Sequence, residues 1–571
     1  MDSITVPGSI YDNLHAVKYR GPQESHREAC NRQAAAQRDS DEHYDAYRYL
    51  LLNQMYLPGG RVQAAMGSTR ITTAYNCFVS GTIEDSFVHE EGNIMQRAWE
   101  AAATMRLGGG IGYDFSTLRP RGDLIKKLQS HTGGPIKFMP IYDATCSAVS
   151  SAGHRRGAQM GILRVDHPDI ESFIHCKQDQ VSLTNFNISV ALTHAFMQAL
   201  KDRTPFELKF GGKVYREIDA NSLWEMLMRS TWDWAEPGSI FIDTINDWNN
   251  LHWLETIAAT NPCSEQPLPP FGACLLGSLN LVRFLQWSGS RYEFLWDEFK
   301  QCIKHIVRAT DNVVDRTVYP IPQQEKEAKN KRRMGIGITA LANTLEALGL
   351  PYASDEFLEM QAKIYKIKRD ETYHASMELA KEKGAFPLFD KDRYAEGKFI
   401  QTLPEDLQGQ IFDYGIRNSH LTSTAPTGTI SITAGNVSSG IEPVFDYQYY
   451  RNIETFNGKE KHLLTDYGYR ELGIKGKTQL GGELIVDDHL NVLAIAQKYT
   501  DSAVSKTCGI QAGYAWDDFK NIYVKAYELG CKGVSTFRID GKRDGILTKK
   551  EDTEDGGACF INPETGEKEC E

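Results

Sequence analysis

The chain has 571 residues, of which 41% are hydrophobic and 24% are charged, and its formal net charge is −12. This composition is ordinary for a globular protein, and the acidic balance excludes a chain whose overall field attracts nucleic acid or an anionic membrane. No stretch approaches the ~18 consecutive apolar residues that cross a bilayer, and the N-terminus lacks the pattern of a secretory signal. We therefore expect a cytoplasmic protein with no membrane partner.

The eleven cysteines fit a reducing compartment, because their number is odd and their spacing shows no extracellular disulfide framework. No metal site is predicted from them. Most are expected to be small buried apolar residues, namely Cys30, Cys146, Cys176, Cys302, Cys508 and Cys531.

The hydrophobic pattern alternates between helix-like and strand-like segments along the chain. Residues 1–55 are polar and helix-prone, and residues 181–190 alternate with period two, as in a half-buried strand. Helices are expected at 221–233, at 296–316, and in two further segments that end at Gly384 and Gly530. This interleaving predicts an α/β architecture built on one central sheet or barrel.

The segment ATNPCSEQPLPPFGACLLGSLNL, residues 259–281, carries the most chemical information. Asn261, Cys263 and Glu265 alternate within it, and the surrounding prolines oppose helix and favour extended backbone. In an extended loop these three side chains project to the same side. We therefore expect an amide, a thiol and a carboxylate to face one pocket.

This trio suits the removal of a hydroxyl from a sugar. A thiol can be oxidised to a thiyl radical that abstracts hydrogen from carbon, the carboxylate can take a proton from the neighbouring hydroxyl, and the amide can hold both in register. An isolated N-x-C-x-E is more often a kinked loop with one buried cysteine, so the motif alone does not establish the chemistry.

A second stretch, STAPTGTIS at 423–431, is rich in small hydroxyl residues around Pro426 and Gly428. Such a loop can direct backbone N–H groups and hydroxyls at a phosphate. An ordinary Ser/Thr/Gly turn explains the same letters equally well.

Together these segments closely resemble ribonucleotide reductases, from about residue 50 to 545. In that family the Asn-x-Cys-x-Glu group lies on a central finger loop and precedes a second cysteine and a Gly-Ser-x-Asn-Leu strand, as Cys274 does in GACLLGSLNL. The segment LPGGRVQAAMGSTRITTAYNCFVSG resembles the one bearing the other reducing cysteine, here Cys77. The resemblance implies a ten-stranded α/β barrel in two five-stranded halves over residues 56–545, enclosing the radical, after a helical region at 1–55.

The resemblance also implies the residue roles. Cys263 abstracts hydrogen, Glu265 acts as base and Asn261 orients the substrate, while Cys77 and Cys274 supply two electrons and become a disulfide. The product is a 2′-deoxyribonucleotide for DNA synthesis, made from a ribonucleoside di- or triphosphate. The residues assigned to substrate binding are Asn76, Gly109, Thr424, Ala425, Pro426, Thr427, Gly428 and Thr429.

Control of specificity by dNTP or ATP effectors is implied in the same way. The segment SSAGHRRGAQMGILRVDHPDI resembles the loop that reports the effector to the active site, although a basic loop next to glycines is equally plausible as a solvated turn. The step TIEDS matches the acidic-Ser step of the effector site, and two arginines of STLRPRGD could neutralise the effector's phosphates. These assignments cover Asp85, Ser86, Arg119, Arg121, His154, Arg155, Arg156 and Gln159.

Both ends of the chain depart from the family's usual pattern. Residues 1–55 lack the signature of an ATP-binding cone, so no overall-activity site is expected. The charged, Gly-rich residues 546–571 are expected to form a flexible redox tail, in which Cys559 and Cys570 re-reduce the active site and exchange with a thioredoxin or glutaredoxin. Their spacing is wider than the usual close pair. A homodimer is the assembly implied, and the short chain suits a compact genome such as that of a virus, which would place it in host cytoplasm.

The radical source is predicted from one further segment. GCKGVSTFRIDGKRDG has Ser535, Thr536 and Phe537 where the class with a ferritin-like dimetal partner subunit has two relay tyrosines. This departure, with the wording around Cys263, favours adenosylcobalamin, although the cysteine-rich ribbon common in that class is missing. A relay through the tyrosines of FDYQYYRN, residues 445–452, is the alternative, against simple aromatic packing.

Two other functions fit parts of the pattern. A glycyl-radical barrel enzyme also uses a finger-loop cysteine, but it lacks a counterpart for Cys77 and Cys274, and no glycyl-radical segment is present. A non-catalytic nucleotide sensor would be expected to have lost Cys263 or Glu265, and both are present.

Overall fold

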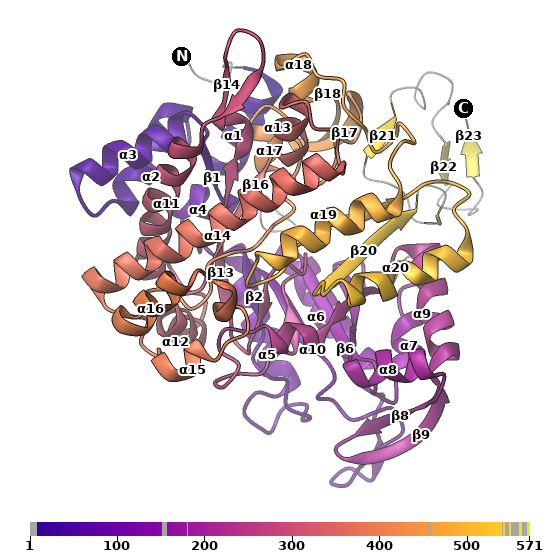
Figure 1. The fold of residues 1–571 in the computed structure, drawn as a ribbon. Coiled ribbons are helices and arrows are strands. Elements are labelled where there is room, and N and C mark those ends of the chain that lie inside the picture. Colours follow the sequence, from indigo (N-terminus) through magenta and orange to yellow (C-terminus); the bar gives the residue numbers. More distant parts are fainter. Residues whose placement is uncertain are drawn as a thin grey trace.

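The computed structural model describes residues 8–150, 157–179, 181–455, 458–538, 541–542, 547–549, 559–561 and 568–570. It is a mixed α/β protein in which helices pack around a central sheet (Figure 1). No helix within the described residues is long and apolar enough to cross a bilayer. The longer helices are α1 (Ile10–Tyr19), α2 (His26–Gln37), α3 (Asp41–Leu52), α5 (Ile94–Arg106), α6 (Pro135–Ser150), α9 (Ala220–Trp234), α11 (Trp296–Arg316), α12 (Pro322–Lys331), α14 (Asp355–Lys383), α16 (Glu405–Tyr414), α19 (Val486–Lys498) and α20 (Trp516–Glu528).

Ten strands form the central sheet. Its order is β1-β13-β2-β3-β6-β7-β10-β20-β19, and β16 pairs with β13 off this path. The strands are β1 (Tyr56–Pro58), β2 (Cys77–Val79), β3 (Gly110–Asp114), β6 (Gln159–Arg164), β7 (Phe186–Leu192), β10 (Gly238–Phe241), β13 (Ala273–Asn280), β16 (Met334–Thr339), β19 (Thr507–Ile510) and β20 (Gly533–Arg538).

Apart from β1, which pairs antiparallel with β13, the strands of this sheet form two parallel groups. The run β2-β3-β6-β7-β10 is parallel throughout. The pairs β13-β16 and β19-β20 are also parallel. The two groups meet antiparallel where β13 pairs with β2 and where β20 pairs with β10. The predicted α/β class is therefore confirmed.

The predicted barrel is not closed by continuous pairing. Between β16 and β19, only the isolated bridges Ile336↔Thr422 and Thr424↔Val504 span the gap. The segment around Thr424 does not form a continuous strand, because the chain leaves the sheet after the bridge at Thr424 and enters the loop at 425–429.

Most predicted elements lie where the sequence placed them. The N-terminal region is helical, and Ser25 caps α2 in a capping box with Glu28. Helix α14 ends at Gly384, whose φ of +82° is the left-handed conformation that glycine adopts most easily. The prediction for 181–190 was wrong in detail, because β7 begins at Phe186 and is buried on both faces nearly throughout, as an interior strand of a parallel sheet is.

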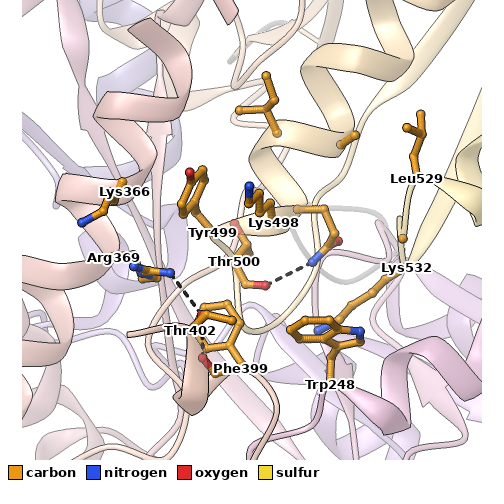
Figure 2. A pocket seen from close by; sticks show the side chains of 14 residues that line it. Trp248, Lys366, Arg369, Phe399, Thr402, Lys498, Tyr499, Thr500, Leu529 and Lys532 are labelled. Atoms are coloured by element: carbon orange, nitrogen blue, oxygen red, sulfur yellow. Dashed lines mark hydrogen bonds between the residues drawn. The ribbon is translucent and has the colours of Figure 1, made fainter. Parts of the chain in front are cut away.

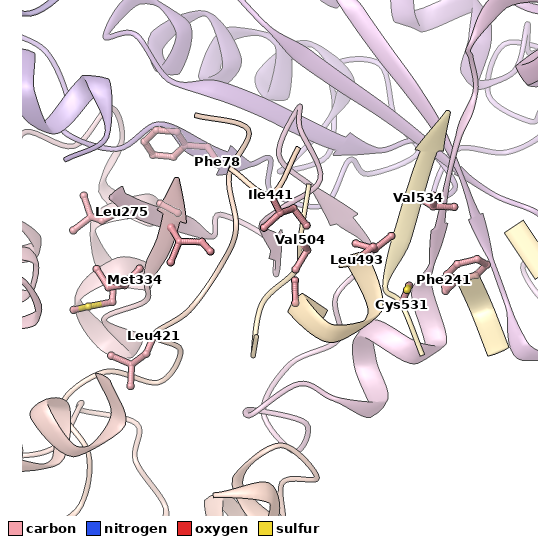
Figure 3. Close-up of a cluster of buried hydrophobic side chains, with 14 of the residues drawn as sticks. Phe78, Phe241, Leu275, Met334, Leu421, Ile441, Leu493, Val504, Cys531 and Val534 are labelled. Carbon is pink, nitrogen blue, oxygen red and sulfur yellow. The ribbon is translucent and has the colours of Figure 1, made fainter. Parts of the chain in front are cut away.

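Buried side chains from both groups of strands share one apolar core. Figure 3 shows Phe78, Leu275 and Met334 on one side of the view and Phe241 and Val534 on the other. Dense packing of this kind gives the strand ends little freedom to move, so it fixes the positions of the loops that they carry.

Smaller hairpins lie outside the central sheet. The three-stranded sheet β18-β17-β21 contains β17 (Gln448–Thr455), β18 (Gly458–Thr465) and β21 (Leu547–Lys549). The other two-stranded pairs are β4 (Leu124–Ile125) with β5 (Ser130–His131), β8 (Pro205–Phe210) with β9 (Lys213–Asp219), β14 (Leu285–Trp287) with β15 (Tyr292–Phe294), and β22 (Cys559–Ile561) with β23 (Lys568–Cys570).

Candidate active site

The segment around Cys263 forms a tight hairpin rather than the extended loop that the prolines predicted. Its arms are β11 (Ala259–Thr260) and β12 (Pro267–Leu268), which pair antiparallel. The amide of Ser264 donates to the carbonyl of Asn261, and Ser264 has a φ of +64°. The side-chain oxygen of Asn261 accepts the amide of Gln266 at 3.0 Å. These local hydrogen bonds close the turn, as short polar side chains do in turns.

The hairpin nevertheless brings its polar side chains to Cys77. The Asn261 amide nitrogen lies 3.1 Å from the Cys77 sulfur. The Cys77 thiol in turn donates to Glu265 Oε1 over 3.6 Å. On the sheet, Cys77 and Cys274 stand directly opposite each other in the antiparallel register of β2 and β13. Two cysteines far apart in sequence therefore lie side by side, next to the hairpin that carries Cys263.

Burial divides the thiols into two kinds. Cys77 and Cys274 are buried, and burial raises the pKa of each thiol well above its ordinary value, so both are protonated at neutral pH. The Cys263 side chain is exposed, which differs from the enclosed radical site that the sequence predicted. All three are thiols, and none is in a disulfide. The site thus pairs an accessible sulfur with a protected dithiol.

Several buried polar atoms close to this hairpin have no hydrogen-bond partner among the described residues. They include Glu265 Oε2, both ends of the Gln266 amide and the Ser423 hydroxyl. Because buried polar atoms in folded proteins are nearly always paired, such a cluster indicates atoms that meet a ligand. Burial also raises the pKa of Glu265, which suits a carboxyl group that exchanges a proton with a substrate.

Three neighbours hold the hairpin in place. The Asn187 side chain on β7 donates to the Pro262 carbonyl at 3.0 Å, and the amide of Ala503 donates to the Glu265 carbonyl at 3.1 Å. On β3, an added Cβ at Gly112 would overlap the carbonyl oxygen of Thr260. The glycines of RLGGGIGYDF therefore admit the hairpin. Gly109, predicted to lie against substrate, instead packs on the Phe78 ring.

Substituting Gly112 by alanine is expected to displace the hairpin and lower kcat by about 10²-fold, because a shift of about 1 Å in reacting groups has a cost of that size. Steady-state kinetics and circular dichroism check this result. Gly409→Ala is the matched control, since Gly409 lies in α16 with nothing within 4 Å of an added Cβ. Unchanged kcat in Gly112→Ala would show that the contact with Thr260 does not position the site.

The predicted phosphate loop is only partly available to a ligand. The Thr424 hydroxyl is buried and lies 3.0 Å from the Tyr365 hydroxyl. Thr427 has a φ of +54°, and its hydroxyl accepts the amide of Gly440 at 2.8 Å. These two hydroxyls hold the loop rather than point to a ligand. The half-buried positions that stay accessible are Ala425, Pro426, Gly428 and Thr429.

Sequence reasoning missed a cation next to this loop. An added Cβ at Gly428 would lie 3.5 Å from the guanidinium of Arg451, on β17. Nothing in the sequence pairs these two positions. Asn76, the remaining predicted substrate residue, is half-buried, and its side chain accepts the amide of Arg61 at 3.4 Å.

The structure describes some of the predicted effector residues but not all of them. Arg119 and Asp85 form an ion pair at 2.5 Å. The Ser86 hydroxyl accepts hydrogen bonds from the backbone N–H groups of His89 and Glu90. The amide of Arg121 is held by Asp169 at 2.9 Å. His154, Arg155 and Arg156 lie outside the described residues.

Gln159 does not belong to the effector loop. It is the first residue of β6, it is buried, and its amide oxygen accepts the Tyr113 hydroxyl at 2.7 Å. Its amide nitrogen donates to the carbonyl of Tyr142. Both ends of the side chain are therefore occupied by the core, and its assignment as an effector-sensing residue stays a prediction.

The segment in the position of the relay tyrosines is strand β20. Ser535 is exposed, Thr536 is buried against the Tyr523 hydroxyl at 2.9 Å, and Phe537 is half-buried. The alternative tyrosines are packed: Tyr449 donates to Asn436 and Tyr447 to the carbonyl of Gly476. Tyr450 lies under the ammonium of Lys461.

The backbone of the tail places its two cysteines in register. Strands β22 and β23 pair antiparallel with Cys559 directly opposite Cys570. The two positions are therefore neighbours across the strand pair although ten residues separate them in the sequence. Within the described residues, no group of three or more His, Cys, Asp or Glu could hold a metal ion.

The chain is similar in sequence to known proteins. The model of the family described as ribonucleotide reductase, barrel domain, matches residues 75–480. The chain is 33% identical over 591 residues to the vitamin B12-dependent ribonucleoside-diphosphate reductase of Mycobacterium tuberculosis, covering 96% of this chain and 81% of that protein. It is also 33% identical over 502 residues to the enzyme of the same description from Thermoplasma acidophilum, covering 82% and 63%. Identity to the ribonucleoside-diphosphate reductase large subunit of Monkeypox virus is 27% over 473 residues, covering 74% and 60%.

Proposed function

Because the chain belongs to the ribonucleotide reductase family and reduces ribonucleotides to deoxyribonucleotides, we propose that Cys263 abstracts hydrogen from the substrate ribose and that Cys77 and Cys274 supply the electrons. The observation that carries this proposal is the contact of the Cys263 hairpin with Cys77, which in turn stands opposite Cys274. An oxidant and a reductant built from different thiols thus meet at one place.

Each polar group has a role that its surroundings support. Glu265 binds Cys77 through one carboxyl oxygen, and its other oxygen has no partner among the described residues, so it is available to take a proton from a ribose hydroxyl. Asn261 holds the Cys77 sulfur at 3.1 Å and orients it. Because Cys77 is protonated, its thiol can deliver a proton to the departing hydroxyl as the disulfide with Cys274 forms.

The Glu265→Gln variant is expected to lose about 10²- to 10⁴-fold in kcat, the usual worth of a positioned general base. Since burial raises the pKa of Glu265, wild-type kcat rises with pH up to that raised pKa. The Glu265 contribution to the stability of the fold is expected to change with pH in the opposite direction. Between the ordinary and raised pKa, Glu265 binds more protons in the folded state than in the unfolded chain, so its contribution to stability falls as pH rises, and the variant lacks this contribution. Kinetics and thermal unfolding over a pH series test both trends, and a variant with a wild-type pH profile would contradict the role.

We propose adenosylcobalamin as the radical source. The residues present fit it: the Cys263 thiol is exposed, and β20 offers Ser535, Thr536 and Phe537 in place of oxidisable relay tyrosines. When bound, this cofactor supplies the oxidant that converts the Cys263 thiol to a thiyl radical. Cys263 would be the residue at its reactive end. The two relatives that are 33% identical are both described as vitamin B12-dependent.

A turnover assay separates the two radical sources. Purified protein with a dithiol reductant and adenosylcobalamin alone is expected to form deoxyribonucleotide. The same protein with a metal-loaded ferritin-like subunit and no cobalamin is expected to form none. Activity in the second reaction only would overturn the cofactor assignment and leave the roles of Cys263, Cys77 and Cys274 intact.

The substrate we propose is a ribonucleoside diphosphate, as in the names of the relatives. The loop at 425–429 offers the backbone N–H groups of Ala425, Gly428 and Thr429, and Arg451 adds a positive charge next to Gly428. A deoxynucleotide or ATP effector would bind near Asp85, Ser86 and Arg119, where the existing ion pair would open to receive it. We also propose that the two parallel groups of strands belong to the two halves of a ten-stranded barrel. The assembly that we propose is a homodimer.

The paired register of β22 and β23 supports a redox role for the tail. Changing both Cys559 and Cys570 to serine is expected to abolish multiple turnovers with thioredoxin, while one turnover from pre-reduced protein remains, because only re-reduction is lost. Product counted per chain with thioredoxin checks this expectation. Cys176→Ser is the control, and sustained turnover by the double variant would exclude the tail as the thiol relay.

A further inference from the structure

A cavity separate from the active site lies among α14, α19, the turn at Ile400–Thr402 and the residues before β20. Its volume is about 540 Å³, which is within the range of small-molecule sites. None of its lining residues belongs to the Cys263 hairpin, to the dithiol or to the loop at 425–429. In Figure 2, Arg369 and Phe399 face Trp248 and Lys532 across it.

All the charged side chains that line this cavity are cationic. Lys366, Arg369, Lys498 and Lys532 line it, and no carboxylate does. Asp370 pairs with both Lys366 and Arg369. In the part of the chain that the structure describes, Lys498 forms no ion pair, and its ammonium lies 5.7 Å from the centre of the Tyr499 ring. The cationic side chains that line the cavity therefore outnumber the carboxylates that form ion pairs with them.

Flat apolar surface accompanies this charge. Trp248, Phe399 and Tyr499 contribute aromatic rings to the lining. The Arg369 guanidinium lies 5.3 Å from the centre of the Tyr499 ring and donates to the Thr402 hydroxyl at 3.1 Å. Arg369 is buried and engaged by Asp370 and Thr402, whereas Lys498 is exposed and can meet an anion beside the same ring. The half-buried Trp248 offers a face on which a planar group stacks.

From this combination we propose that the cavity binds a nucleotide, with its phosphate against Lys498 and its base against Trp248. One further contact links the cavity to the catalytic hairpin. The Lys532 ammonium donates to the carbonyl of Ser502 at 2.7 Å, and the amide of the next residue, Ala503, holds the carbonyl of Glu265. Ser502 and Ala503 therefore connect a ligand beside Lys532 to the proposed base, Glu265.

Equilibrium dialysis of labelled AMP against the full-length protein tests this proposal. A saturating diphosphate substrate and a saturating deoxynucleoside triphosphate are included so that the active site and the effector site are filled. We expect one further equivalent of AMP to bind, and Lys498→Gln to weaken that binding about tenfold through loss of a charge-assisted contact. Lys498 is exposed, so this variant keeps its fold. Trp248→Leu is expected to weaken binding as well.

The matched control is Lys363→Gln, which removes the same charge from α14, where Lys363 lies over Trp296 and does not line the cavity. It should bind AMP like the wild type. Absence of the further equivalent, equal weakening by Lys363→Gln, or inorganic phosphate binding as tightly as AMP would each overturn the nucleotide assignment. Because the readout is binding, it gives a result whether or not the catalytic roles proposed above hold.

Discussion

Replacing Cys263 by serine is expected to abolish deoxyribonucleotide formation completely. A hydroxyl group gives up its hydrogen atom far less readily than a thiol, so the oxidant that creates a sulfur radical does not create the oxygen radical needed to replace it. The two side chains are nearly the same size, and position 263 is exposed on a hairpin whose turn is closed by backbone contacts of Asn261 and Ser264. The fold is therefore expected to remain.

Chromatographic measurement of product under turnover conditions checks this outcome. Thermal unfolding and substrate binding should match the wild type, which separates a chemical loss from a structural one. Cys176→Ser, at a half-buried thiol outside the site, is expected to retain activity. Measurable turnover by Cys263→Ser would exclude Cys263 as the hydrogen-abstracting residue.

The Cys77→Ser variant is expected to fail at a later step than Cys263→Ser. Serine can still accept from Asn261 and donate to Glu265, so the pocket keeps its hydrogen bonds. It cannot form a disulfide with Cys274, so the two electrons for reduction are missing. Hydrogen abstraction from the ribose by Cys263 continues, but multiple turnovers to normal product do not.

A substrate labelled with tritium on the ribose carbon next to the departing hydroxyl distinguishes these steps. Cys77→Ser is expected to release label without accumulating deoxyribonucleotide, whereas Cys263→Ser should release none. Cys274→Ser should resemble Cys77→Ser, because the two residues are register partners across β2 and β13. Normal turnover by either dithiol variant would show that the electrons come from elsewhere.

Local patterns predicted the local structure well. The boundaries of α11 and α14, and the cap at Gly384, follow from helical periodicity and glycine placement. The turn at Asn261–Ser264 was missed because the prolines favour extended backbone, yet hydrogen bonds of Asn261 close the turn and offset the cost of a left-handed Ser264. The Asn261 side chain acts here on a residue five positions away, a range that propensity describes poorly.

Contacts between distant segments could not be predicted from spacing. The opposition of Cys77 and Cys274 needs the register of two strands that are far apart in sequence, and only the likeness to a family indicated it beforehand. The requirement for Gly112 is visible only once Thr260 is seen beside it. The hydroxyls of Thr424 and Thr427 looked available for phosphate because their partners, Tyr365 and Gly440, come from other elements.

The most direct test of the account is to map thiols after one turnover. Pre-reduced protein carrying Cys559→Ser and Cys570→Ser, so that the tail cannot re-reduce the site, is given substrate and the radical source without external reductant. It is then alkylated, digested and analysed by mass spectrometry. We expect one disulfide between Cys77 and Cys274 for each deoxyribonucleotide formed, with Cys263 recovered as an alkylated thiol. Product formed while Cys77 and Cys274 remain reduced, or a disulfide that contains Cys263, would contradict the separation of oxidant and reductant proposed for this site.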